Sequence, residues 1–125
     1  MKQSELNIIL EEHAKWLHHN STGKIADLSG ANLRGANLEG TNLSSADLIG
    51  ANIRYVIGNG KEIKTLQTEF YQVTHKSTQM AIGCEQHAIT DWFKFDDERI
   101  EAMDERAKEF WTIYKPILQL LVREA

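Results

Sequence analysis

Apolar residues in the middle of the chain recur at every fifth position. Leu or Ile occupies positions 28, 33, 38, 43, 48 and 53. A helix repeats about every 3.6 residues and a strand about every 2, so this spacing matches neither. A small residue lies two positions before each of these, Asp or Asn one before, and Gly or Ser two after until Tyr55 breaks the pattern. The regularity predicts a repeated five-residue backbone unit.

We expect each unit to form one side of a square coil, with the small residue and the leucine pointing inward. Four units complete a coil, so six units give about one and a half coils. Gly, Asn and Asp suit the corners because they tolerate the dihedral angles of turns. The pattern Ala-(Asp/Asn)-Leu-x-x resembles the pentapeptide-repeat family, which implies a right-handed quadrilateral β-helix. The outward residues form no acidic stripe, so the duplex-DNA imitation of longer members is not expected.

The segment before the repeats has the spacing of an amphipathic helix. An apolar face is formed by Leu6, Ile9, Leu10, Trp16 and Leu17. Ser4 is the expected N-cap, the helix is expected to run to about His19, and the stretch from Asn20 to Gly23 breaks it. An open coil end exposes leucine and unpaired backbone, so residues 1–24 are predicted to cap the coil of residues 25–55.

Residues 56–125 are predicted to form an α+β module. Short apolar runs separated by turn residues predict a β-meander with strands over Tyr55–Ile57, Glu62–Leu66, Phe70–His75 and Gln79–Cys84. Asp96 and Asp104 are expected N-caps of helices over about 97–103 and 105–123. Pro116 lies inside the second helical pattern and is expected to bend or restart that helix. The whole chain is therefore predicted to be α+β.

The C-terminal half also carries a resemblance. The strings "IGNGKEIKTLQ" and "MAIGCEQHAITDW" resemble a module that follows short pentapeptide stretches in bacteriophage proteins of unassigned function. The resemblance implies a phage or prophage origin and brings no catalytic residues with it.

Composition restricts the function classes. The 125 residues carry a net charge of −4, which argues against direct nucleic-acid binding. A single cysteine excludes an internal disulfide and fits a reducing compartment. No apolar run is long enough to span a bilayer. We therefore expect no membrane partner, and a location in the cytoplasm of an infected or lysogenic bacterial host.

Cys84, His87 and His75 are the best candidates for chemistry. A Cys–His pair can perform nucleophilic catalysis, and Cys-x-x-His is half of a zinc site. Against this, cysteine is among the most buried residue types, and no acidic residue is evidently placed to orient a histidine. We expect no catalytic residue, no metal and no cofactor. These three residues are predicted to be structural, or alternatively to line a ligand pocket.

The stretch "DDERIEAMDE" holds six acids and one arginine. Asp97, Glu101 and Glu105 could form a docking face for a basic partner, although acids are also favoured at helix starts by the helix dipole. Surplus apolar residues on the last helix, Ile113, Ile117 and Leu120, suggest a second buried face, as in a homodimer or higher homo-oligomer.

Two functions follow. The favoured one is a non-enzymatic phage or prophage accessory protein that binds a host protein or other host macromolecule, plausibly to counter a defence system. The alternative is an oligomeric small-ligand binder that sequesters a nucleotide-like signal near His75, Cys84 and His87.

Overall fold

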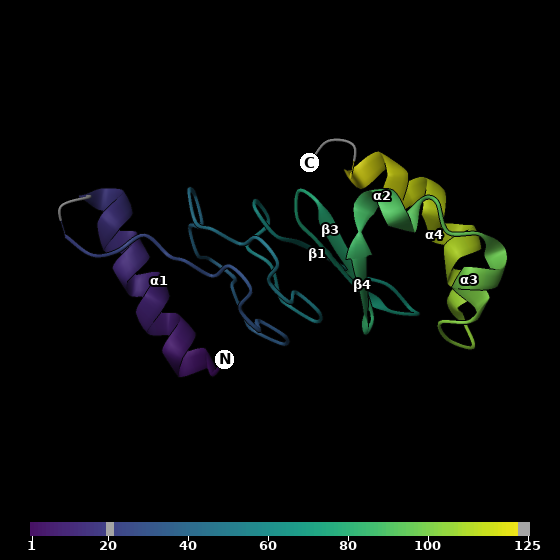
Figure 1. Ribbon diagram of the computed structural model, residues 1–125, viewed down its shortest axis with the longest axis horizontal. Coiled ribbons are helices and arrows are strands. Elements are labelled where there is room, and N and C mark those ends of the chain that lie inside the picture. The colour runs from purple at the N-terminus through teal and green to yellow at the C-terminus, as the bar shows by residue number, and fades with distance from the viewer. Residues whose placement is uncertain (20–21, 123–125) are drawn as a thin grey trace.

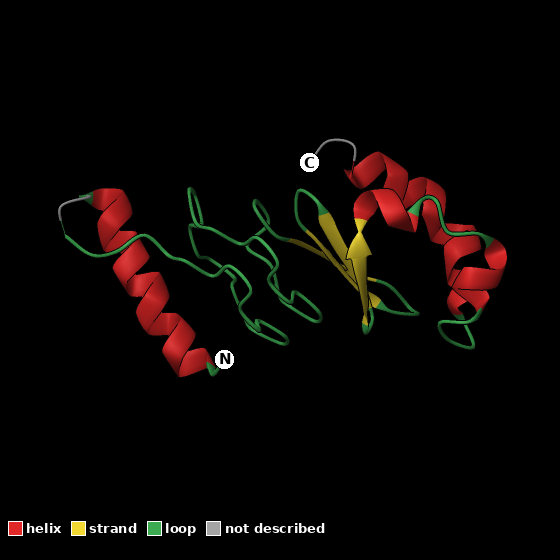
Figure 2. Ribbon diagram, in the orientation of Figure 1, coloured by secondary structure: helices red, strands yellow, loops and turns green. Residues whose placement is uncertain are grey.

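Four layers follow one another along the molecule. The computed structural model describes residues 1–19 and 22–122. Helix α1 (Gln3–His18) lies at one end, the repeat segment comes next, a four-stranded sheet follows, and three helices cover the far side of the sheet (Figures 1 and 2). The molecule is therefore a mixed helix and sheet structure, as predicted.

The repeat segment returns to the same side after four five-residue units. Parallel bridges join Asp27 to Asp47, Asn32 to Asn52 and Asn37 to Ile57, each pair being 20 residues apart. The Leu28 N–H, for example, donates to the Asp47 carbonyl at 2.8 Å. Pairing within the described coil is limited to these isolated bridges, without continuous strands. The chain therefore returns to the same side every 20 residues.

The interior of the coil contains the residues that the repeat placed there. Leu28, Leu33, Leu38, Leu43 and Ile53 are at most 1% exposed. Leu48 is partly buried, and the small residues two positions earlier are buried or half-buried. Each fully buried Leu or Ile contributes about 1.5–3 kcal/mol relative to an exposed one. The predicted inward register is confirmed.

Each corner is built from one side chain and one backbone conformation. The Asp or Asn oxygen accepts the backbone N–H two residues later in all six units, at 2.9 to 3.1 Å. The residue three positions after the Asp or Asn has a positive φ, which glycine adopts without strain.

Tyr55 continues this corner pattern although its residue type breaks it. It takes φ 60°, as Ser45 takes 66°, and the Arg34 guanidinium lies over its ring at 5.0 Å. The coil therefore continues to Ile57, whose bridge to Asn37 is the last in the coil. The strand predicted over Tyr55–Ile57 is wrong because the turn at Asn52 still directs the backbone there.

Helix α1 covers the first open edge of the coil. Gln3 uses both ends of its amide on Asn37, accepting the N–H at 2.9 Å and donating to the carbonyl at 3.1 Å. The buried His13 accepts the Ala26 N–H on Nδ1 and donates from Nε2 to the Ser44 carbonyl, both at 2.9 Å. These bonds satisfy backbone groups that the coil itself leaves unpaired.

The start of α1 differs from the prediction. Lys2 is the N-cap, without a side-chain hydrogen bond, so the cap assigned to Ser4 is wrong. Ser4 already lies within the first turn because Gln3 binds the coil and begins the helix. Part of the predicted break, residues 20 and 21, lies outside the described residues.

The sheet is an open antiparallel meander in the order β1-β2-β3-β4. Its strands are β1 (Lys64–Gln67), β2 (Gln72–His75), β3 (Gln79–Ile82) and β4 (Glu85–Ala88). The strand predicted over Gln79–Cys84 ends at Ile82 because Gly83 has φ 56° and turns the chain. Strand β4 was not predicted, since "EQHA" has little strand character.

One face of the sheet closes the second end of the coil with polar side chains. Thr65, Gln72 and Thr74 all donate to the Val56 carbonyl, at 2.9, 2.9 and 3.1 Å. Gln86 accepts the Ile53 N–H at 2.9 Å and donates to the Ala51 carbonyl at 3.0 Å.

Ile63 fills the interior where the repeat lacks a leucine. The seventh inward position is Gly58, at which a Cβ atom would lie 2.1 Å from the Ile63 carbonyl oxygen. Ile63 is fully buried in the coil core instead. The chain can therefore leave the coil without opening its interior.

The other face of the sheet packs on helices α2 (Ile89–Trp92), α3 (Asp97–Glu101) and α4 (Ala107–Val122). Val73, Met80 and Ile82 join the helices in a second core, which includes the aromatic residues Trp92, Phe110 and Trp111. The predicted cap is confirmed, since Asp96 accepts the Arg99 N–H at 2.9 Å. Helix α2 was not predicted.

Helix α4 continues through Pro116, so the predicted restart is wrong. Phe110 and Trp111 before the proline and Leu118 after it are all buried in the second core. Packing on both sides of the proline holds the two halves in one helix, despite the missing N–H.

The coil register makes a direct prediction. Leu38→Asp places a charge in the closed interior, where an unpaired buried charge costs several kcal/mol. The melting temperature of this variant should therefore fall sharply. Glu39→Lys changes the adjacent exposed side chain and should leave the melting temperature nearly unchanged. Equal melting temperatures for the two variants, measured by circular dichroism, would contradict the inward register.

Candidate functional site

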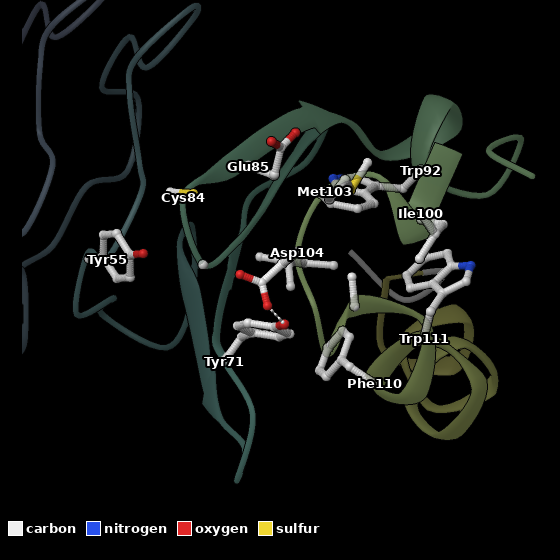
Figure 3. A pocket seen from close by; sticks show the side chains of 13 residues that line it. Tyr55, Tyr71, Cys84, Glu85, Trp92, Ile100, Met103, Asp104, Phe110 and Trp111 are labelled. Atoms are coloured by element: carbon white, nitrogen blue, oxygen red, sulfur yellow. Dashed lines mark hydrogen bonds between the residues drawn. The ribbon is translucent and has the colours of Figure 1, made fainter. Parts of the chain in front are cut away.

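A cavity of about 100 Å³ lies where the coil, the sheet and the helices meet (Figure 3). Tyr55 reaches it from the coil, and Tyr71 from the segment before β2. Cys84 and Glu85 lie at the β3–β4 turn, and Asp104 precedes α4. Its deeper wall is apolar and includes Trp92, Ile100, Met103, Phe110 and Trp111.

The polar side of the cavity is organised by one hydrogen bond. The Tyr71 hydroxyl donates to the Asp104 carboxylate at 2.5 Å, as Figure 3 shows. Burial and this carboxylate raise the pKa of Tyr71 to about 12. The same hydrogen bond, with the Arg106 N–H, lowers the pKa of Asp104. At neutral pH the pair is thus a neutral donor and an ionised acceptor.

Cys84 lies exposed at the β3–β4 turn, without a histidine beside it. Its carbonyl accepts Arg54 Nε at 2.6 Å, which ties the turn to the coil. None of the hydrogen bonds or ion pairs found among the described residues joins the Cys84 thiol to a histidine.

His87 is engaged elsewhere. Its Nε2 donates to Glu85 Oε1 at 2.8 Å, and its ring lies edge-on to Trp92 and Phe95, with centroids 5.2 and 5.1 Å apart. Glu85 is the orienting acid that the sequence did not reveal. It holds His87 against the aromatic core and does not serve Cys84.

His75 occupies a third position. Strand register pairs it with Met80, which pairs in turn with His87, so Met80 separates the two histidines across the sheet. His75 lines a different hollow, beside lysines. The three residues predicted as one pocket are thus distributed over three places. Among residues 1–19 and 22–122, no group of His, Cys, Asp or Glu could hold a metal ion.

The predicted acidic residues are all exposed, and two of them share a groove with an apolar residue. Glu101 and Glu105 line an open groove along the start of α4 together with Glu109 and Ile113. From Ile113 an apolar stripe continues along one side of α4 through Ile117 and Leu120, which are 49%, 44% and 61% exposed. Asp97 is exposed in the first turn of α3 and does not line the groove.

The cavity beside Cys84 is small for a ligand site. Pockets for small molecules measure roughly 300–1,000 Å³, and a cavity of about 150 Å³ takes a benzene-sized guest. A cavity near 100 Å³ accepts less than that. The groove that Glu101, Glu105 and Ile113 line is wider and more open than this cavity.

Sequence reasoning missed Tyr71 and Asp104 as partners. Asp104 was assigned only to helix capping, and its oxygen does accept the Arg106 N–H at 3.2 Å. Tyr71 lies 33 residues away in sequence, and its place in the strand predicted over Phe70–His75 gave no indication of Asp104. No local signal connects two such positions.

The Tyr71–Asp104 bond predicts an alkaline titration. Because the folded pKa is raised, the bond stabilises the fold below about pH 10, and this contribution is lost as pH rises through about 12. Asp104→Asn should lower the Tyr71 pKa toward its ordinary value, as followed by phenolate absorbance. Tyr71→Phe is the control that removes this titration, and an Asp104→Asn curve identical to wild type would contradict the assignment.

Comparison with known proteins identifies one part of the chain. A family model described as pentapeptide repeats (8 copies) matches residues 26–56. No curated protein and no solved structure matches the chain. None of the described helices is long and apolar enough to cross a membrane. The matched residues are the coil with its six five-residue units, which is therefore a pentapeptide-repeat segment.

Proposed function

We propose that this protein is a non-enzymatic binding protein that docks on a host protein through the surface formed by α3 and α4. The observation that carries the proposal is the groove in which Glu101, Glu105 and Glu109 lie beside Ile113. Exposed apolar side chains rimmed by charged ones are typical of protein–protein contacts. Asp97 extends the acidic character onto α3.

Charge complementarity defines the partner. Lys108 lies 3.4 Å from Glu101 and neutralises part of the groove, but the acids remain in excess. A partner surface with lysine or arginine around an apolar centre would match it. Attraction of this kind is screened over about 10 Å at 0.1 M salt, so binding should weaken as salt rises.

The cellular setting is proposed from the sequence resemblance. The likeness of the C-terminal half to bacteriophage proteins supports a phage or prophage accessory protein in the host cytoplasm, with counter-defence as its role. We also propose that the pentapeptide-repeat segment is a short right-handed quadrilateral β-helix. In this proposal it acts as a rigid spacer between α1 and the docking surface, not as a DNA mimic.

We propose that another copy of the chain packs on the apolar stripe of α4, as well as the host protein that docks on the acidic groove. Ile117 and Leu120 lie beyond the acidic groove, toward the end of α4 where Pro116, Gln119 and Leu120 line a separate open hollow. A homodimer would cover this end and leave the acidic groove accessible. A nucleotide-like ligand, the alternative function, would need a pocket formed between such copies, since the cavity beside Cys84 measures only about 100 Å³.

The docking proposal predicts a response to charge reversal. Replacing Asp97, Glu101 and Glu105 together with lysine should abolish activity in a phage or host assay, because a basic partner would then be repelled. His87→Ala should retain activity, since His87 packs against Trp92 and Phe95 away from the groove. Circular dichroism checks that both variants are folded.

Two results would oppose this reading. Full activity of the folded triple-lysine variant would exclude docking through the acidic surface. Loss of activity in folded His87→Ala or Cys84→Ala, together with a small molecule retained by the native protein in mass spectrometry, would favour the ligand-binding alternative.

The dimer has its own test. Ile117→Glu or Leu120→Glu places a charge on the exposed stripe, so the fold should persist while the mass measured by light scattering falls to that of a monomer. Thr112→Glu places the same charge on an exposed residue of α4 that lies in the acidic groove, which the dimer leaves accessible, and serves as the matched control. A wild-type protein that is already monomeric would remove the proposal.

A further inference from the structure

A second hollow, of about 120 Å³, lies at the edge of the sheet, away from the docking surface. It is lined by Lys61, Glu62, Lys64, His75, Lys76 and Ser77. These residues come from the loop that leaves the coil, from β1, and from the end of β2 with the turn that follows it. Three chain segments thus bring three lysines to one small concave site.

The lining of this hollow carries a net positive charge. Lys61, Lys64 and Lys76 take part in none of the ion pairs found within the described chain. The one acid in the lining, Glu62, offsets one of the three positive charges. Its Oε1 accepts the Leu43 N–H at 3.2 Å and Asn59 Nδ2 at 2.9 Å, and does not pair with a lysine.

Lys76 is the most unusual of the three lysines. It is only 7% exposed. Burial lowers its pKa, while Asp47 on the coil acts in the opposite direction by favouring the charged form. The aliphatic part of Lys76 is therefore packed into the wall of the hollow, which fixes where its ammonium group emerges.

His75, which also lines the hollow, carries a buried nitrogen without a partner. It is 4% exposed, and its Nδ1 atom is buried without any hydrogen-bond partner. Buried polar atoms are paired in the great majority of cases, so such an atom indicates a functional constraint or an absent partner. Burial, with Lys64 beside the ring, lowers the pKa of His75, so the ring is neutral at pH 7 and keeps one N–H to donate.

We propose that this hollow binds a small tetrahedral oxyanion, namely the phosphoryl group of a small phosphorylated molecule or free phosphate. The lysine ammonium groups and the Ser77 hydroxyl supply donors for several of its oxygens. At about 30 Å³ for each water molecule, the hollow has room for roughly four waters, which suits one phosphoryl group but not a whole nucleotide. The rest of a larger ligand would extend into solvent.

Calorimetric titration with inorganic phosphate at low salt tests the proposal. Wild type should bind, and Lys64→Gln should weaken binding at least about tenfold, the loss expected for one charge-assisted hydrogen bond. Lys94→Gln removes the same charge from an exposed residue outside the hollow and should bind like wild type. Lys61→Gln, an exposed position, provides a second variant that leaves the buried residues intact.

Nuclear magnetic resonance of the His75 ring shows whether phosphate binds in this hollow. Phosphate should shift the ring signals of His75 in wild type and leave those of the exposed His18 unchanged. Titration with AMP separates the two sources of the anion: AMP binding through the same lysines indicates an organic phosphate, and phosphate binding without AMP binding indicates the free ion. Absence of binding by wild type at millimolar phosphate, or equal weakening in Lys64→Gln and Lys94→Gln, would overturn the proposal.

Discussion

The unpaired backbone at the two ends of the coil is the constraint on which the rest of the structure depends. Six units return on themselves once, so none of them is bridged to a neighbour on both sides within the described coil. Gln3 and His13 complete the hydrogen bonds at one end, and Thr65, Thr74 and Gln86 complete them at the other. The coil is stable only as part of the whole chain, because buried backbone groups need partners.

The sheet therefore serves two different neighbours. Its polar face continues the hydrogen bonding of the coil, and its apolar face, with Val73 and Met80, supports the helices. This division holds α4 and its exposed surface at a fixed place relative to the coil. The cavity beside Tyr71 and the lysine hollow both lie where this sheet meets other elements, one at the β3–β4 turn and one at the β1 edge.

The repeat could be predicted because each of its positions has a local role. Leucine fills the interior, Asp or Asn closes the corner, and the next corner residue takes positive φ. Tyr55 could not be predicted as a corner, since its conformation follows from its neighbours and not from its own preference. His75, Cys84 and His87 were expected together, but strand register places Met80 between the histidines and Cys84 at a turn. The lysine hollow joins residues whose spacing carries no pattern of its own.

The 20-residue return has a consequence for how such a chain can change its length. Caps at both ends bind particular positions of the repeat, as Gln3 does at Asn37 and Gln86 at Ile53. Inserting one five-residue unit would shift one cap by a quarter of the 20-residue return and misalign these bonds. Inserting four units would restore the alignment and separate the ends by about 4.8 Å, the spacing of paired strands. In the proposed β-helix, the distance between α1 and the C-terminal helices therefore changes in steps of one whole coil.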